Sequence, residues 1–152
     1  MSSDIGQVLQ RAARLHRARI AQAIADLGLF AGQEQALLVL ADKGEITVGA
    51  LAEILNVRPP TVSKMVLRLV GQKMVERRDS EADARRTTLT LTKEGQRSAK
   101  ALKARLAAID EELAEELDAK DLKRLKKLLK KFSRALAKLP EGDDEDELSD
   151  TD

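Results

Sequence analysis

The chain has 152 residues, short enough for one domain, and its 43% hydrophobic and 35% charged residues suit a helical globular protein with many surface charges. It has no cysteine, which excludes disulfides, thiol redox chemistry and cysteine-based zinc sites, and a single histidine argues against a histidine-rich metal site. No apolar run is long enough to span a membrane and the N-terminus lacks a signal-peptide core, so we expect a cytoplasmic protein that does not contact membranes.

Charge is divided unevenly along the chain, although the formal net charge is only +1. Residues 1–140 contain all 27 Lys and Arg and 18 of the acids, whereas residues 141–152 contain 8 acids and no base. Between residues 58 and 105 there are 13 bases and 5 acids. A concentrated basic segment is typical of nucleic-acid binding, and the whole-chain total conceals it.

Apolar residues recur at helical spacing in the first third of the chain and predict two helices, over residues 5–27 and 33–41. Gly28 and Gly44 are placed to end these helices. Ile46 is predicted to form a short strand that joins a later hairpin as its third strand.

Residues 48–55 and 59–71 predict two further helices, joined by a tight turn at Asn56 and Val57. Thr47 is placed to cap the first of these helices. Two prolines open the second, where a missing N–H does no harm. Two short helices joined in this way predict a helix-turn-helix, whose second helix enters the major groove of DNA.

The second of these helices is predicted to be amphipathic. One face is apolar at helical spacing. The other face has short hydrogen-bonding side chains and long cations, the types that read base edges and hold phosphates. We predict that the DNA-contacting residues of this segment are Arg58, Pro60, Thr61, Ser63, Lys64 and Arg68.

A two-stranded hairpin is predicted next, with strands over residues 74–78 and 87–91 and a loop over residues 79–86. The second strand alternates polar and apolar residues, so Leu89 and Leu91 should face the helices. The DNA-contacting residues predicted for this hairpin are Arg77, Arg78, Asp83, Arg85 and Arg86. An ordinary helical hairpin with a solvated charged face is the alternative, but a turn, a polar helix face and a basic hairpin in this order favour DNA binding.

Two long amphipathic helices are predicted over residues 93–117 and 121–139, with Thr92 capping the first and a break at residues 118–119. Their leucine stripes, together with that of the N-terminal helix, exceed what a small winged domain can cover. We therefore predict a homodimer in which the terminal helices of two chains bury each other's stripes. A monomeric helical layer is the alternative. The lysine-rich run within residues 120–138 also suits a membrane-surface or partner helix, although the surface of an oligomer is favoured.

The fold expected from these elements is mainly α, an α+β winged helix. One regulator domain would cover residues 1–140, with a DNA-binding lobe over 30–92 and dimerisation helices over 5–27 and 93–139. Residues 141–152 are too acidic to support a core and are expected to form a disordered tail. A sharper hypothesis is that this tail mimics DNA and competes for the basic segment, in which case its deletion should raise non-specific DNA affinity at low salt.

The order helix, helix, helix-turn-helix, wing and two long helices resembles the MarR family of winged-helix bacterial regulators over roughly residues 5–139. The most specific part of the resemblance is the wing, which reads Glu76-Arg77-Arg78-Asp79, then Asp83-Ala84-Arg85-Arg86, then Leu91-Thr92-Lys93-Glu94-Gly95. The pattern is also matched by Gly32-Gln33 before Leu37, and by Leu51-Ala52 before Val57, Thr61, Val62 and Ser63.

The resemblance implies a homodimer that binds a pseudo-palindromic operator, with the helix over residues 59–71 of each subunit in the major groove. It implies that Arg85 reaches the adjacent minor groove while Asp83 holds its guanidinium. A bidentate carboxylate would fix the orientation of that arginine, and a narrow minor groove attracts a cation. It also implies a small-molecule ligand, commonly an aromatic or phenolic acid, in a cleft between the dimer lobe and the winged lobe. The residues expected near this cleft are His16, Arg19, Phe30 and the start of the helix over residues 93–117, although a lone histidine in mid-helix is more often simply packed.

We therefore expect a sequence-specific transcriptional regulator, a ligand-responsive repressor that binds double-stranded DNA as a homodimer. The alternative is a winged-helix architectural or protein–protein module that coats DNA without sequence choice, with a steep salt dependence and little operator preference. An enzyme is disfavoured because the sequence shows no nucleophile–base pair, no phosphate-binding glycine-rich loop and no metal-ligand constellation. We accordingly predict no catalytic residues, no metal and no cofactor.

Overall fold

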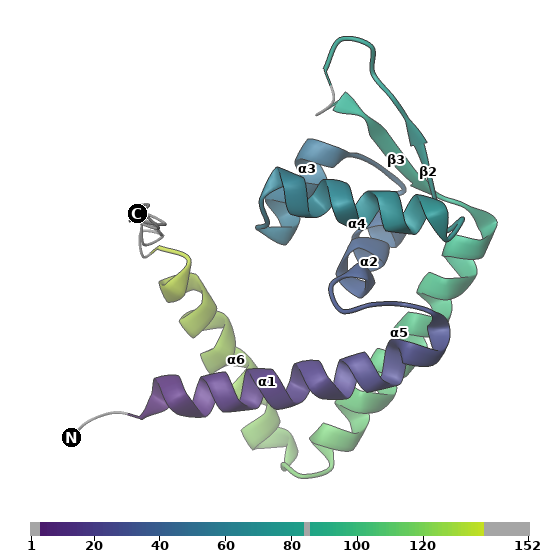
Figure 1. The fold of residues 1–152 in the computed structure, drawn as a ribbon. Coiled ribbons are helices and arrows are strands. Elements are labelled where there is room, and N and C mark those ends of the chain that lie inside the picture. The colour runs from purple at the N-terminus through teal and green to yellow at the C-terminus, as the bar shows by residue number, and fades with distance from the viewer. Residues whose placement is uncertain (1–3, 84–85, 139–152) are drawn as a thin grey trace, which may run out of the picture. The chain divides into compact units, whose positions relative to one another are not determined.

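The computed structural model describes residues 4–83 and 86–138, and the chain divides into two compact units, Met1–Glu111 and Glu112–Asp152 (Figure 1). The elements of the first unit are α1 (Ile5–Ile24), η1 (Ala25–Leu27), α2 (Gln33–Lys43), β1 (Glu45–Thr47), α3 (Val48–Leu55), α4 (Pro59–Gly71), β2 (Val75–Arg78), β3 (Thr88–Leu91) and most of α5 (Lys93–Ala114). The second unit contains α6 (Ala119–Leu136). The predicted acidic tail lies outside the described residues.

Glycines with positive φ follow η1 and α2. After α1 the chain makes one 3₁₀ turn, η1, and Gly28 (φ 71°) then donates its N–H to the carbonyl of Ala25. α2 reaches Lys43, slightly beyond the predicted range, and Gly44 (φ 77°) donates its N–H to the carbonyl of Leu40. A positive φ has little steric cost for glycine, so Gly28 and Gly44 end the helical segments as predicted, although α1 itself ends at Ile24 and η1 forms the last three residues of the predicted range 5–27.

The helices α3 and α4 form the predicted helix-turn-helix. The hydroxyl of Thr47 accepts the N–H of Ala50 at 3.1 Å, which confirms Thr47 as the N-cap of α3. Asn56 ends α3 in a left-handed conformation (φ 52°), which asparagine tolerates better than most residues. Pro59 occupies the first position of α4, where the helix has no use for its missing N–H.

The three strands form one antiparallel sheet in the order β1-β3-β2. Ile46 lies opposite Leu89, and Val75 lies opposite Leu91. The strand predicted at Ile46 is therefore confirmed, and β3 is the central strand. Leu89 is buried and Leu91 is half-buried, so the alternation along β3 also predicted the inward face of the sheet.

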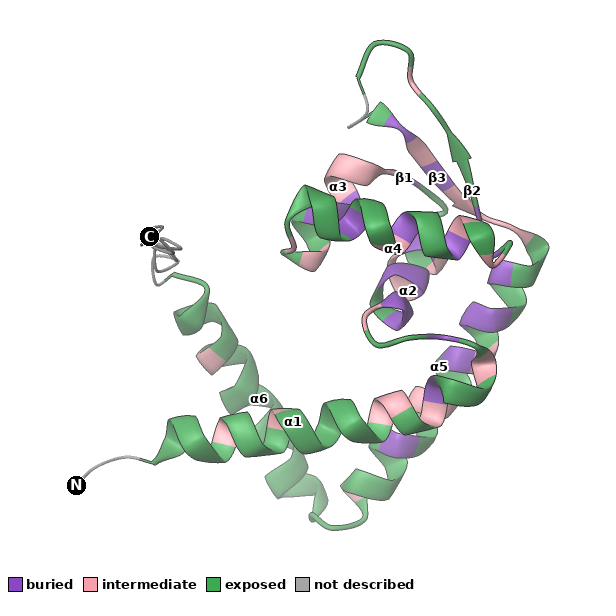
Figure 2. Ribbon diagram, viewed as in Figure 1, coloured by how far each residue is buried: buried purple, intermediate pink, exposed green. Residues whose placement is uncertain are grey.

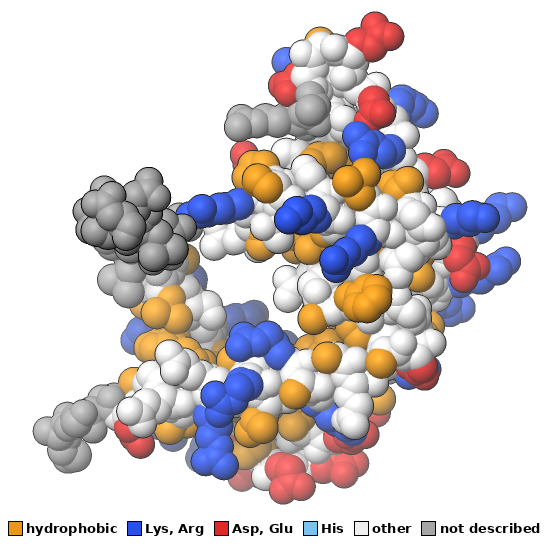
Figure 3. Space-filling model, in the orientation of Figure 1, with side chains coloured by type: hydrophobic (Ala, Val, Ile, Leu, Met, Phe, Trp, Pro, Cys, Tyr) orange, Lys and Arg blue, Asp and Glu red, His pale blue; other side chains and the backbone are white. Residues whose placement is uncertain are grey.

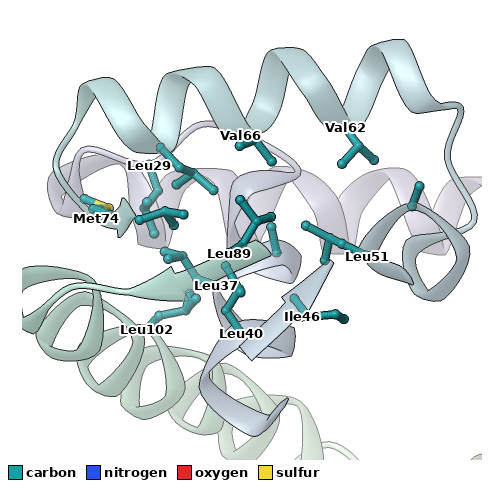
Figure 4. Packing of buried hydrophobic residues seen from close by; sticks show 14 of the residues in the cluster. Leu29, Leu37, Leu40, Ile46, Leu51, Val62, Val66, Met74, Leu89 and Leu102 are labelled. Carbon is teal, nitrogen blue, oxygen red and sulfur yellow. The ribbon is translucent and has the colours of Figure 1, made fainter. Parts of the chain in front are cut away.

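The core of the first unit lies between α4, the sheet and the helices α2 and α5 (Figure 4). Val62 and Val66 point from α4 toward Leu89, and Leu37 and Leu102 complete the cluster from α2 and α5. Each of these five side chains is at most 2% exposed. Burial of such a side chain stabilises the fold by about 1.5–3 kcal/mol. This packing uses one side of α4 and leaves the opposite side open.

The second unit is built on α6. The carboxylate of Asp118 accepts the N–H of Asp121 at 2.7 Å and so caps the helix, which begins at Ala119. The predicted start at Asp121, after a break at residues 118–119, is therefore wrong, because a carboxylate at the N-cap position starts a helix by binding a free N–H. α6 ends at Leu136, with Ala137 as its C-cap, so the prediction that this helix continues to residue 139 is also wrong.

The helix α5 is also shorter than predicted. It ends at Ala114 instead of residue 117. The N–H groups of Glu116 and Leu117 bond to carbonyls three residues earlier, at 3.3 and 3.2 Å. The chain therefore leaves the α-helical pattern as a tight turn before the cap of α6.

Most of α1 and α6 is exposed (Figure 2), and the exposed residues include large apolar ones. On α1, Ile5, Val8 and Leu15 are 55%, 54% and 59% exposed. The large apolar side chains that α6 leaves exposed are Leu122, Leu125, Leu128, Leu129 and Leu136. In the part of the chain that the structure describes, no helix combines the length and the apolar character that a membrane span requires.

Candidate nucleic-acid interface

The helix α4 has two faces of opposite character. Val62, Val66 and Leu69 are buried in the core. Lys and Arg side chains are spread along the helix on the face seen in Figure 3. All the DNA-contacting residues predicted for this segment are exposed, namely Arg58, Pro60, Thr61, Ser63, Lys64 and Arg68. Helical spacing and burial thus separate a packing face from a polar face that is open to a ligand.

The N-terminal end of α4 adds a favourable field for anions. None of the residues in its first turn is acidic. Arg58 precedes the helix in an extended conformation, and its carbonyl accepts the N–H groups of Thr61 and Val62 at 3.0 and 3.2 Å. The positive end of the helix dipole and the guanidinium of Arg58 are therefore close in sequence and both favour a phosphate.

In the hairpin, Arg77 is bound within the protein. Its Nε and Nη2 atoms lie 2.8 and 2.7 Å from the same carboxylate oxygen of Asp79. That oxygen also accepts the hydroxyl of Thr87, a buried residue, at 3.5 Å. An exposed ion pair of this kind contributes at most about 1 kcal/mol. Its main effect is to orient Arg77. Arg78 and Arg86 are exposed, as Arg77 is.

A backbone hydrogen bond at the tip of the hairpin joins two of the predicted DNA-contacting residues. The carbonyl of Asp83 accepts the N–H of Arg86 at 3.0 Å. Both residues are exposed. Arg85 lies outside the described residues, so its pairing with Asp83 and its place in a minor groove stay predictions.

The structure shows two contacts at the C-terminal end of α4 that sequence patterns do not predict. The guanidinium of Arg68 lies 5.8 Å from the ring centroid of Phe30. The amide of Gln72 donates to the carbonyl of Gly28 at 2.6 Å and accepts from the amide of Gln33 at 3.1 Å. Gln72 lies 44 residues from Gly28 and 39 residues from Gln33 in sequence. Helical and strand periodicity predict no contacts at such separations.

A cavity of about 260 Å³ lies between α1, the start of α2 and the turn from α3 to α4. Its lining residues are His16, Arg17, Ile20, Ala21, Ala31, Gly32, Glu34, Gln35, Leu55, Val57 and Met65. Of the three residues expected near a ligand cleft, His16 lines this cavity, whereas Arg19 and Phe30 do not. Among residues 4–83 and 86–138, no group of three or more His, Cys, Asp or Glu side chains is placed to hold a metal ion.

A helix-turn-helix with an exposed polar second helix, followed by a basic antiparallel hairpin, defines a winged helix-turn-helix DNA-binding protein. The MarR family model matches residues 31–86, which include both helices of the motif and the first strand of the hairpin. An HTH-type transcriptional regulator of Mycobacterium leprae is 32% identical over 117 residues, 77% of each chain. The chain therefore belongs to the MarR family of transcriptional regulators.

Solved structures share the same fold. A mutant MarR from E. coli, complexed with operator DNA, superposes with a TM-score of 0.76 at 24% identity and covers 84% of this chain and 92% of its own. BpsR of Bordetella bronchiseptica, whose DNA binding is regulated by 6-hydroxynicotinic acid, has a TM-score of 0.78 at 26% identity and covers 86% of this chain and 99% of its own. The predicted family and winged-helix fold are thus confirmed.

Proposed function

We propose that this regulator binds a pseudo-palindromic operator as a homodimer and represses transcription until a small-molecule effector binds. The observation that supports this most is the exposed polar face of α4, held by a buried apolar face and followed by a basic hairpin. We assign DNA binding to the lobe over residues 30–92. Two copies of α4 related by a twofold axis would enter successive major grooves, about 34 Å apart.

The residues of this surface divide by chemistry into two roles. Thr61, Ser63 and Lys64 are short hydrogen bonders and a flexible cation in the first half of α4, so we assign them to base edges. Arg58 and Arg68 lie toward the two ends of the helix, which would face the sugar-phosphate backbones at the edges of the major groove. We therefore assign them to phosphates. The hairpin residues Arg78, Asp83, Arg85 and Arg86 would then act at the adjacent minor groove.

The dimer is supported by apolar surface that a single chain leaves uncovered. Leu125, Leu128 and Leu129 of α6 are 41%, 52% and 44% exposed, and they recur at spacings of three and four. Ile5 and Leu15 of α1 are exposed in the same way. Exposure of apolar surface to water is unfavourable in free energy. We therefore assign the helices within residues 5–27 and 93–139 to dimerisation with a second copy.

The cavity beside His16 supports an effector site. Leu55, Val57 and Met65 provide apolar walls, while His16 and Arg17 provide nitrogen donors. Its volume of about 260 Å³ suits a single-ring organic acid. Because α1 and α4 both line the cavity, an occupant would contact a helix assigned to dimerisation and the helix assigned to DNA reading. A change in their relative position would alter the spacing of the two α4 helices and lower operator affinity.

Selection from a random duplex pool at near-physiological salt, followed by sequencing, tests this proposal. Recovery of an inverted repeat with half-site centres about 10 base pairs apart supports a dimeric, sequence-specific regulator. Recovery of no common sequence, with retention that disappears as salt rises, would instead support the architectural alternative. A parallel selection with residues 141–152 deleted shows whether the acidic tail suppresses non-specific binding.

A further inference from the structure

Phe30 is an exposed aromatic side chain next to a buried anchor. It lies between η1 and α2, and 61% of its surface is exposed, whereas the neighbouring Leu29 is only 4% exposed. The chain contains only two phenylalanines and no Trp or Tyr. An exposed ring of this size gains little for the core, and the cavity beside His16 does not use it. Its position therefore points to a contact made elsewhere.

The ring of Phe30 contacts Arg68. The guanidinium carbon lies 5.8 Å from the ring centroid, within the range of a cation–π interaction. Arg68 is exposed and follows Thr61 and Lys64 at spacings of three and four, so it continues the polar face of α4 by one turn. The ring thus lies beside the face assigned to DNA.

The loop that bears Phe30 is fixed to the end of α4. The Phe30 N–H donates to the side-chain carbonyl of Gln33 at 3.0 Å, and the Gln33 N–H donates to the Phe30 carbonyl at 3.0 Å. The Gln33 side chain donates to Gln72 at 3.1 Å, and Gln72 donates to the carbonyl of Gly28 at 2.6 Å. Gln33 is only 2% exposed, so its bond to Gln72 is partly shielded from water, whereas the bond from Gln72 to Gly28 is exposed. The backbone that bears the ring is therefore held beside the end of α4 by backbone and amide hydrogen bonds.

We propose that Phe30 is a positioning residue for Arg68 in DNA recognition. Its ring holds the guanidinium over the end of α4, in place for a phosphate at the edge of the major groove. A free arginine side chain loses rotamer entropy when it binds a phosphate, and a supporting ring reduces that loss because the side chain is already ordered. This inference rests on the proposed DNA-binding role of α4, but it needs no particular operator sequence.

The test is a double-mutant cycle of Phe30→Ala and Arg68→Ala, read as the Kd for duplex DNA across a salt series. Both the selected duplex and a random-sequence duplex are used, since phosphates occur in each. We expect Phe30→Ala to weaken binding about two- to fivefold for each subunit. Its effect should vanish when Arg68 is already alanine. Arg68→Ala should reduce the slope of log K against log salt by about 0.9 for each phosphate that the protein no longer neutralises. Phe30→Ala should leave this slope unchanged, because the positive charge of Arg68 remains.

Two further variants distinguish the effect of the aromatic face of Phe30 from the effect of its apolar volume. Phe30→Trp keeps an aromatic face and should retain affinity, whereas Phe30→Leu keeps an apolar side chain without that face and should behave as Phe30→Ala. Equal losses from Phe30→Ala with and without Arg68 would overturn the proposal, as would full affinity of Phe30→Leu. Failure to select an operator would refute only the sequence-specific function, because the cycle on random-sequence DNA still measures the coupling of the two side chains. Melting temperatures of all variants verify that the fold is retained.

Discussion

Gly95 of α5 lies directly against the backbone carbonyl of Met74, where α4 passes into the hairpin. A Cβ atom built at position 95 would lie 1.9 Å from the Met74 oxygen and 2.9 Å from its carbonyl carbon. Both neighbours are backbone atoms and cannot turn away as a side chain would. The same carbonyl accepts the N–H of Thr92 at 3.1 Å. The close approach of α5 to the base of the wing therefore requires glycine.

Gly95→Ala should destabilise the protein by at least about 2 kcal/mol, because the backbone of α5 must move away from Met74 to admit a methyl group. Chemical unfolding followed by circular dichroism measures the loss. Gly71→Ala is the matched control, since a Cβ at Gly71 meets no atom within 4 Å. The control should change the free energy of unfolding by less than about 1 kcal/mol. Equal effects of the two substitutions would contradict the role given to the Gly95 contact.

Thr92 joins the end of the sheet to the start of α5 with one hydroxyl. It donates to the carbonyl of Lys73 at 2.7 Å and accepts the N–H of Gly95 at 3.0 Å. We expect Thr92→Val to cost about 1–2 kcal/mol, because the isosteric side chain loses the cap and leaves the Lys73 carbonyl without this donor. Thr92→Ser keeps the hydroxyl and should remain within about 0.5 kcal/mol of the parent. Thermal unfolding of the three proteins side by side provides the comparison.

Lys64 lies on the exposed face of α4, next to the short polar side chains that we assign to base edges. Lys64→Ala should weaken binding to the selected duplex by about 1–3 kcal/mol and should relax the base preference at one position of each half-site. Lys103, an exposed lysine of α5, offers a charge-matched control in Lys103→Ala. Titrations against the selected duplex and its single-base variants measure both effects. If the two alanine variants bind all duplexes alike, Lys64 has no reading role.

Leu128 of α6 is 52% exposed and belongs to the apolar stripe that we assign to the dimer. Leu128→Glu places a charge on this stripe and should convert the protein to monomers at micromolar concentration, since burial of an unpaired carboxylate costs several kcal/mol. Lys127→Gln changes the net charge by the same amount outside the stripe and should leave the dimer intact. Sedimentation velocity distinguishes the species. A parent protein that sediments as a monomer would refute the dimer itself.

The elements of this protein could be predicted from the sequence because their causes are local. Helical spacing of apolar residues predicts the helices. Their starts and ends depend on nearby residues, such as Thr47 and Thr92 at helix starts and Gly28 and Gly44 at helix ends. The same spacing is enough to separate the packing face of α4 from its polar face. The errors are in helix bounds, most clearly at the junction between α5 and α6, where α5 ends at Ala114 and Asp118 caps α6.

Only the tertiary structure decided which distant residues meet. The family resemblance implies a ligand cleft near Phe30 but gives no reason to expect the contact of its ring with Arg68. That contact depends on the loop after η1, which is bonded to Gln72 at the end of α4. The approach of Gly95 to Met74 likewise depends on how α5 crosses the base of the wing. Periodicity determines which face of an element is apolar, but pairing between elements depends on the packing of whole side chains in three dimensions. The class of protein could therefore be predicted from the sequence, whereas the contact between Phe30 and Arg68 depends on the tertiary structure.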